Sequence, residues 1–224
     1  MLHIDDPPAA TLHTMTDPCP PILHLDERLI VLDKPTGLLS VPGIGEEKQD
    51  CLARRVQATY PEARIVHRLD RDTSGVIVMA RDAEAHRELS RQFHDREVEK
   101  RYTAVVAGRV EEDEGEIDRP MRKDLENPPR QIIDEVHGRR SITRWLVVKR
   151  DSDRTRLELT PITGRSHQLR LHLASTGHPV LGDDLYAPAE VLAMADRLQL
   201  HARRLWLVHP SNAAPMSFES PCPF

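Results

Sequence analysis

The stretch IVHRLDRDTSGVIVMAR, from Ile65 to Arg81, places a dense group of charges between two apolar runs. Its second half, SGVIVMA from Ser74 to Ala80, is continuously apolar, which predicts a strand buried on both faces. The polar side chains before it are those of His67, Arg68, Asp70, Arg71 and Asp72. Surface turns carry charge routinely, so this group alone does not define a functional site.

The rest of the chain indicates short strands with helices interspersed irregularly. We expect helices over 51–60, 83–98 and 167–176, the second capped by Asp82 and the third ended by Gly177. We expect further strands over 22–25, 29–32, 100–110, 142–149, 155–160, 198–209 and 216–219, with an exposed acidic turn over 111–118. This order favours an α+β fold over a doubly wound sheet. The proline-rich residues 1–21 predict a flexible leader before a single domain over 22–224.

The composition is that of an ordinary globular protein, with 39% hydrophobic and 30% charged residues. No apolar run reaches the roughly 20 residues of a membrane helix, and the N-terminus lacks the apolar core of a secretory signal. The three cysteines are far apart and show no CxxC spacing, which argues for free thiols and against a zinc site. We therefore expect a cytoplasmic protein without a metal or a membrane contact.

The net charge is −5, but the basic residues are segregated. Of the 31 lysines and arginines, 25 lie between residues 51 and 172, on either side of the acidic run 111–118. Local rather than net potential attracts phosphates, so two basic blocks are compatible with a nucleic-acid partner. Arginine-rich chains without such a partner are also common, so the indication is weak.

Several catalytic interpretations of HRLDRDTSG fail. A protein-kinase catalytic loop requires His-Arg-Asp, whereas here Leu69 intervenes and the chain has no glycine-rich phosphate loop. An aspartic protease requires Asp-Thr-Gly or Asp-Ser-Gly from two lobes, whereas DTSG is one residue too long and occurs once. His167 and His172 are five residues apart, so on one helix they do not form a metal-binding pair.

A second informative stretch is LTPITGRSHQLRLHLASTGHPVLGDDLY, from Leu159 to Tyr186. Together with LDKPTGLLSVPG, HRLDRDTSGVIVMA and KRYTAVV, in this order along residues 22–221, it resembles the RluA family of pseudouridine synthases. The resemblance implies that family's catalytic fold, a mainly antiparallel mixed sheet flanked by helices. Because the motifs begin near residue 30, we expect no S4-type RNA-binding domain before them.

The resemblance implies that Asp70 is the catalytic nucleophile and that no cofactor takes part. A carboxylate can add to C6 of uracil, form an ester at ribose C1′ or abstract the 2′ proton, and the sequence leaves these three routes open. An ionised Asp70 in a desolvated pocket needs a nearby cation, and the resemblance assigns this role to a buried Arg165.

Tyr102 corresponds to the family's tyrosine that stacks on the uracil, and Arg68 to the arginine that fills the space left by the flipped base. We interpret His67 as structural and Asp72 as a partner of Arg71. Lys34 either contacts a phosphate or braces its own turn.

The short form of the chain is most similar to the family's dual-specificity member. This implies structured RNA as the partner: uridine 32 of tRNA anticodon stem-loops and uridine 746 of 23S rRNA, bound by a monomer whose basic blocks contact phosphates. A synthase with a single RNA target and a catalytically inactive RNA-binding protein on the same fold are the alternatives.

Overall fold

The computed structural model describes residues 19–224, so most of the expected leader, residues 1–18, lies outside the described residues. The strands are β1 (Ile22–Leu25), β2 (Leu29–Lys34), β3 (Arg64–Ile65), β4 (Ser74–Ala80), β5 (Glu99–Ala107), β6 (Glu114–Asp118), β7 (Met121–Lys123), β8 (Gln131–Ile133), β9 (Ile142–Arg150), β10 (Arg154–Pro161), β11 (Leu200–Val208) and β12 (Pro215–Glu219). The helices are the 3-10 turn η1 (Glu46–Lys48), α1 (Leu52–Gln57), α2 (Ala83–His94), α3 (Gln168–Ser175) and α4 (Ala189–Leu192). Asp82 caps α2 as expected, because its carboxylate accepts hydrogen bonds from the backbone N–H groups of Glu84 and Ala85.

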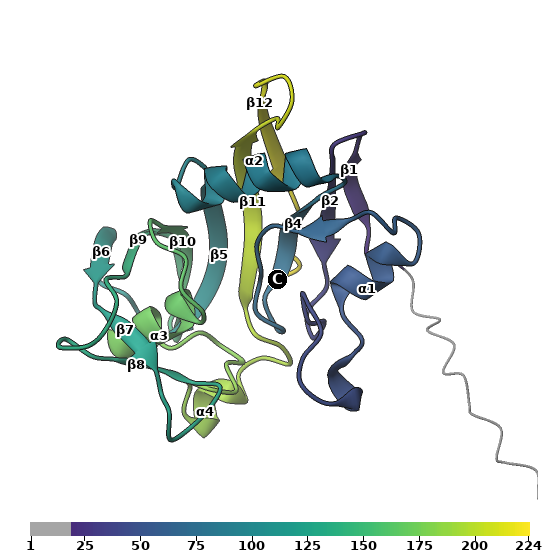
Figure 1. Ribbon diagram of the computed structural model, residues 1–224. Coiled ribbons are helices and arrows are strands. Elements are labelled where there is room, and N and C mark those ends of the chain that lie inside the picture. Colours follow the sequence, from purple (N-terminus) through teal and green to yellow (C-terminus); the bar gives the residue numbers. More distant parts are fainter. Residues whose placement is uncertain (1–18) are drawn as a thin grey trace, which may run out of the picture.

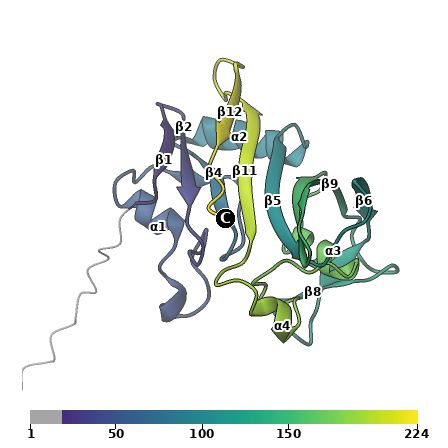
Figure 2. The ribbon, with the colours of Figure 1, turned by 180° about the vertical axis from the view of Figure 1, so that it is seen from behind.

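One ten-stranded sheet organises the molecule, in the order β1-β2-β4-β11-β5-β10-β9-β6, with β3 added to β4 and β12 to β11. Every neighbouring pair is antiparallel except β4 and β11, which run parallel. Helix α1 lies beside the β1–β2–β4 end, and α3 lies with the small β7–β8 sheet at the other end (Figures 1 and 2). The expected α+β fold with a mixed, mainly antiparallel sheet is confirmed.

The region after β5 differs from the sequence-based expectation. The acidic run 111–118 is not simply an exposed turn, because its second half is β6, which pairs with β9 at the edge of the sheet. Its carboxylates face the arginines of the neighbouring basic block: Glu116 pairs with Arg144, Asp113 with Arg150 and Asp118 with Arg140. The acidic run therefore neutralises part of the basic block expected to contact phosphates.

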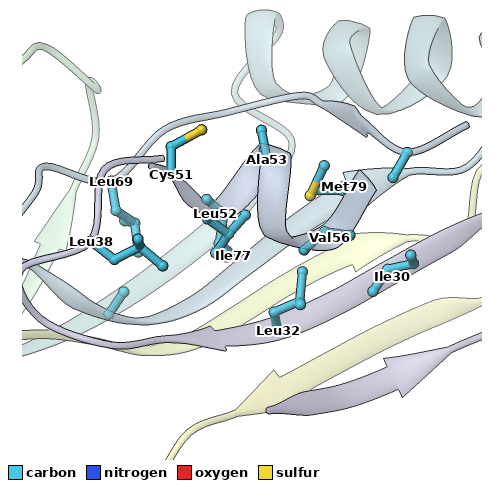
Figure 3. Close-up of a cluster of buried hydrophobic side chains, with 12 residues drawn as sticks. Ile30, Leu32, Leu38, Cys51, Leu52, Ala53, Val56, Leu69, Ile77 and Met79 are labelled. Atoms are coloured by element: carbon cyan, nitrogen blue, oxygen red, sulfur yellow. The ribbon is translucent and has the colours of Figure 1, made fainter. Parts of the chain in front are cut away.

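Strand β4 is buried along its whole length, as its apolar sequence predicts. Because side chains alternate along a strand, Ile77 and Met79 pack into one core cluster, whereas Val76 and Val78 pack into another. The first cluster is completed by α1 and by residues of the segments around it (Figure 3). The second is completed by α2 and β11. Helices on both sides thus fix the strand that follows the charged turn.

Gly75 permits the parallel contact between β4 and β11. Its φ is +111°, and a Cβ atom there would lie 2.2 Å from the carbonyl oxygen of Ala202. Only glycine accepts both this backbone conformation and so close an approach. The β11 backbone consequently lies directly against the start of β4, which follows the charged turn in the sequence.

The termini and cysteines complete the description. Cys19 packs against the first core cluster, and the Pro21 carbonyl accepts a hydrogen bond from the Asp33 N–H, so these residues of the expected leader contact the domain. Cys19, Cys51 and Cys222 are free thiols, as expected. None of the helices between residues 19 and 224 has the length and apolar character needed to cross a membrane.

Candidate active site

A cavity of about 720 Å³ opens where three segments meet: the turn 65–73 before β4, the connection from α2 into β5, and the turn 161–169 from β10 into α3. All four residues singled out from the sequence line it, namely Arg68, Asp70, Tyr102 and Arg165. They come from segments up to 97 positions apart, so the fold brings together what the sequence left separate.

Asp70 lies in this cavity with its carboxylate available. Its side chain is 25% exposed, and no other residue in the described range 19–224 hydrogen-bonds to its oxygens. The nearest titratable partner is His167, whose Nε2 lies 4.0 Å from Asp70 Oδ1. A carboxylate held in a cavity without protein donors can meet an incoming ligand directly.

The turn that carries Asp70 is tied to the segment 34–40 on both sides of the aspartate. Leu69, just before Asp70, is buried in the first core cluster (Figure 3), and its carbonyl and N–H both bond to Ser40 Oγ, at 2.7 and 3.1 Å. After Asp70, the Asp72 carbonyl accepts a hydrogen bond from Thr36 Oγ1 at 2.8 Å. The turn is therefore fixed by contacts that do not use the Asp70 side chain.

Lys34 is the third tie and is fully buried. Its ammonium group donates to the carbonyls of Arg71, Pro35 and Leu38 at 2.6–2.8 Å. Burial lowers the pKa of Lys34 to about 7, while the nearby charges of Asp72 and Asp70 favour the protonated form. Of the two roles considered for Lys34, bracing the turn is confirmed and contact with a phosphate is wrong, because the side chain has no exposed surface.

Tyr102 lines the cavity from β5 and also contacts both neighbouring core clusters. Burial raises the pKa of its hydroxyl well above the usual value, and the charge of Asp70 raises it further. The phenol is therefore neutral at physiological pH, with its ring beside the nucleophile candidate.

The expectation that Arg165 is a buried cation beside Asp70 is wrong. Arg165 lies in the turn before α3, where its side chain is exposed, and no ion pair joins it to Asp70 among the described residues. The buried arginine of this motif is Arg170, only 2% exposed, which pairs with Asp183 and Asp184. Burial alone would lower the pKa of Arg170, but the hydrogen bonds and charge of Asp183 outweigh it, with a further contribution from the charge of Asp70. Arg170 thus supplies the permanent positive charge near Asp70.

Arg68 is exposed at the cavity, and Arg71 pairs with Asp72 as expected. Arg71 also reaches Asp184 at 3.4 Å, so the turn is linked to the acidic pair that holds Arg170. His67 is structural, as interpreted: its ring stacks on Phe93 with 4.3 Å between centroids, and its Nε2 accepts a hydrogen bond from the Val78 N–H.

Two residues of the site were missed by the sequence analysis. His167 adopts a left-handed backbone conformation, with φ of 57°, directly before α3. Its Nδ1 lies 2.9 Å from the Tyr186 hydroxyl, which also accepts a hydrogen bond from the Gln131 N–H. Burial lowers the pKa of His167 and raises that of Tyr186 to about 12, so both groups are uncharged near neutral pH. The signal that could have found them is that GRSHQ and GDDLY stand in the single stretch Leu159–Tyr186, where the structure joins His167 to Tyr186.

Comparison with known proteins agrees with this geometry. Residues 28–175 match the family model described as RNA pseudouridylate synthase. The chain therefore belongs to the RNA pseudouridylate synthase family, enzymes that isomerise uridine to pseudouridine in RNA.

Individual relatives are similar over nearly the whole chain. A protein of Yersinia pestis named dual-specificity RNA pseudouridine synthase RluA is 49% identical over 91% of this chain and 99% of its own length. The protein of the same name from Escherichia coli is 48% identical over 91% of this chain and 93% of its own length. Among solved structures, human RNA pseudouridylate synthase domain containing 1 has a TM-score of 0.77 and 26% identity, covering 91% of this chain and 84% of its own.

The Ser40 tie gives the first prediction. Replacing Ser40 by Ala leaves the buried N–H and carbonyl of Leu69 without this partner, so we expect the free energy of unfolding to fall by about 1–3 kcal/mol. Because Leu69 precedes Asp70, turnover should also fall, by about 10- to 100-fold. Urea unfolding and pseudouridine formation measure the two effects. Ser217→Ala, at an exposed serine of β12, is the control and should change stability by less than about 0.5 kcal/mol. Equal behaviour of both variants would contradict the role of Ser40.

His67 gives a prediction about pH. Burial, with a smaller effect of the Lys100 charge, lowers the pKa of His67 from 6.5 to about 3. Between about pH 6.5 and pH 3, His67 is therefore protonated in the unfolded chain and neutral in the folded protein. The free energy of unfolding falls as the pH is lowered through this range. Between pH 7 and pH 5, we expect the wild type to lose about 2 kcal/mol more than His67→Gln, which has no such group. Urea unfolding of both proteins at the two pH values measures this difference, and parallel losses would show that His67 is protonated in the folded state.

Proposed function

We propose that this protein is a dual-specificity pseudouridine synthase that modifies both tRNA and 23S ribosomal RNA. The supporting observation is the 48–49% identity to proteins of that name across 91% of this chain and at least 93% of theirs. The similarity extends over nearly the full length of these relatives. The expected targets are uridine 32 of tRNA anticodon stem-loops and uridine 746 of 23S rRNA.

Asp70 acts as the nucleophile in this proposal. Pseudouridine formation breaks the bond between ribose C1′ and uracil N1, rotates the base and forms a bond from C1′ to C5, after which C5 loses its proton. The free carboxylate of Asp70 in the cavity suits attack on the nucleotide or removal of a ribose proton. In this proposal Arg170, rather than Arg165, is the buried cation that interacts with the charge of Asp70.

Tyr102 and the exposed arginines handle the base. A base must leave its stack to reach Asp70, and the neutral Tyr102 ring is placed to stack on its face. Arg68 then occupies the gap left in the RNA, and Arg165 contacts the substrate from the turn before α3.

We assign residues 22–224 to one catalytic domain, which works in the cytoplasm as a monomer and without a cofactor.

Substitution of the nucleophile tests the chemistry. With RNA carrying tritium at uracil C5, we expect the wild type to release tritium and Asp70→Asn to release none, because the amide is not nucleophilic. Binding of the RNA by Asp70→Asn should stay within about threefold of the wild type. The control is Asp72→Asn, which removes a carboxylate from the same turn and should keep most of the turnover. Tritium release by Asp70→Asn at the wild-type rate would exclude Asp70 as the nucleophile.

Modification mapping tests the targets. We expect the purified protein to form pseudouridine in the anticodon stem-loop and in 23S rRNA, both taken from a strain lacking this activity. Mass spectrometry of nuclease fragments locates the modified positions. Modification of only one of the two RNAs would replace the dual-specificity proposal by a single-target synthase.

A further inference from the structure

The wall of the cavity carries four cations and one carboxylate. The cations are Arg68, Arg96, Lys100 and Arg165, and the carboxylate is Asp70. The mechanism above uses Arg68 and Arg165 but gives no task to Arg96 and Lys100. Arg96 lies on the short connection between α2 and β5 (Figure 1), and Lys100 is the second residue of β5. Both line the cavity together with Phe93 and Tyr102.

Arg96 and Lys100 have no counter-ion within the described chain. Neither side chain forms a hydrogen bond or an ion pair with another residue between 19 and 224. The nearest arginines on either side behave differently: Arg91 binds Glu88 and Glu97, and Arg101 binds Glu99 and Glu158. Carboxylates are therefore plentiful around Arg96 and Lys100, but they are engaged elsewhere.

Arg91 engages both carboxylates that flank Arg96 in the sequence. Its guanidinium group bonds to Asp95 at 3.1 Å and to Glu97 at 2.7 Å, the residues immediately before and after Arg96. Both flanking carboxylates are thus engaged with Arg91. The local charge pattern leaves one free cation at the cavity.

The backbone at Arg96 is strained in addition. Its φ is +62°, in the left-handed region that a side chain with a Cβ atom rarely adopts. Glycine would adopt this conformation without strain, so the arginine side chain is present at a cost in backbone conformational energy. Such strain is concentrated at functional sites, where the surrounding structure imposes it.

Lys100 is half-buried and close to the turn before α3. A Cβ atom on Gly164 would lie 3.7 Å from Lys100 Nζ, which places this ammonium beside the neighbour of Arg165. Burial lowers the pKa of Lys100, and the positive charge of Arg96 lowers it further. Two like charges in a partly desolvated place are unfavourable until an anion lies between them.

We propose that Arg96 and Lys100 form a phosphate-binding subsite that takes a backbone phosphodiester next to the target uridine. The inference rests on the proposed function, since that function brings an RNA strand to this cavity. A nucleotide whose base reaches Asp70 carries its flanking phosphates to the cavity wall, and phosphates are the anions present in every RNA substrate. The subsite positions the strand and does not read its sequence.

Binding measurements test the subsite. We expect Arg96→Gly and Lys100→Gln each to weaken binding of a target stem-loop by roughly tenfold. The slope of log K against log salt should become shallower by about 0.7 for each lost phosphate contact. The matched control is Arg87→Gln, which removes an exposed arginine of α2 that also lacks a partner in the described chain but does not line the cavity. Its affinity and salt slope should equal those of the wild type.

Two further measurements, of the melting temperature and of the kinetic constants, separate an effect on binding from effects on folding and on chemistry. Because glycine relaxes the backbone at φ of +62°, the melting temperature of Arg96→Gly should not fall, whereas a purely structural arginine would lower it. In tritium release, KM should rise about tenfold while kcat changes by less than twofold.

Neutral phosphate analogues identify the contact. We expect a methylphosphonate at one of the two phosphates flanking the target uridine to weaken RNA binding by the wild type. The same substitution should not change RNA binding by the double variant that combines Arg96→Gly and Lys100→Gln. Wild-type affinity in the variants, or equal sensitivity of wild type and double variant to both methylphosphonates, would overturn the subsite. If the wild type instead binds through Arg96 and Lys100 but releases no tritium, the proposed function fails and the subsite stands.

Discussion

The buried ammonium group of Lys34 is the interaction on which the geometry of the site depends. A charge without exposure loses its hydration, which is costly unless hydrogen bonds replace it. Three carbonyl oxygens match the three donors of the ammonium, and one of them belongs to Arg71, the residue after Asp70. The contact therefore converts a local turn at the end of β2 into a support for the turn before β4. Thr36 and Ser40 repeat the same connection through their hydroxyl groups.

This arrangement separates the parts of the turn that are fixed from the part that reacts. Leu69 is held in the core and the carbonyls of residues 69, 71 and 72 are bound, while the carboxylate of Asp70 is left without a protein donor. Arg170 acts at longer range, because Asp183 and Asp184 hold its guanidinium group in place and Arg71 joins Asp184 to the turn. The field at Asp70 is thus set by groups whose positions are fixed before a substrate arrives, which is the arrangement that favours electrostatic stabilisation of a transition state.

The sequence predicted the elements that have strong patterns and the residues that belong to short motifs. The buried strand β4, the capped helix α2 and the cavity residues Asp70 and Tyr102 fall in this class. Arg165 and Arg170 show the limit, since both stand in one motif and linear order does not tell which of them points inward. Helix α3 is buried on most sides, so its apolar pattern gives no polar face from which the burial of Arg170 could be inferred. The residues that pair with Arg170 are Asp183 and Asp184, which lie 13 and 14 positions further along the chain. Only the fold brings them next to Arg170.

Charge counting failed for a related reason. The basic block 119–172 was expected to contact RNA phosphates, yet Arg140, Arg144 and Arg150 are paired with the acidic run at the β6–β9 edge. An arginine already bound to a carboxylate has to break that pair before it can hold a phosphate, whereas an unpaired one does not. The four cations of the cavity wall differ from Arg140, Arg144 and Arg150 in that none of them has an ion-pair partner within residues 19–224. Such a difference exists only in three dimensions, because it depends on which carboxylates the fold brings within reach of each guanidinium group.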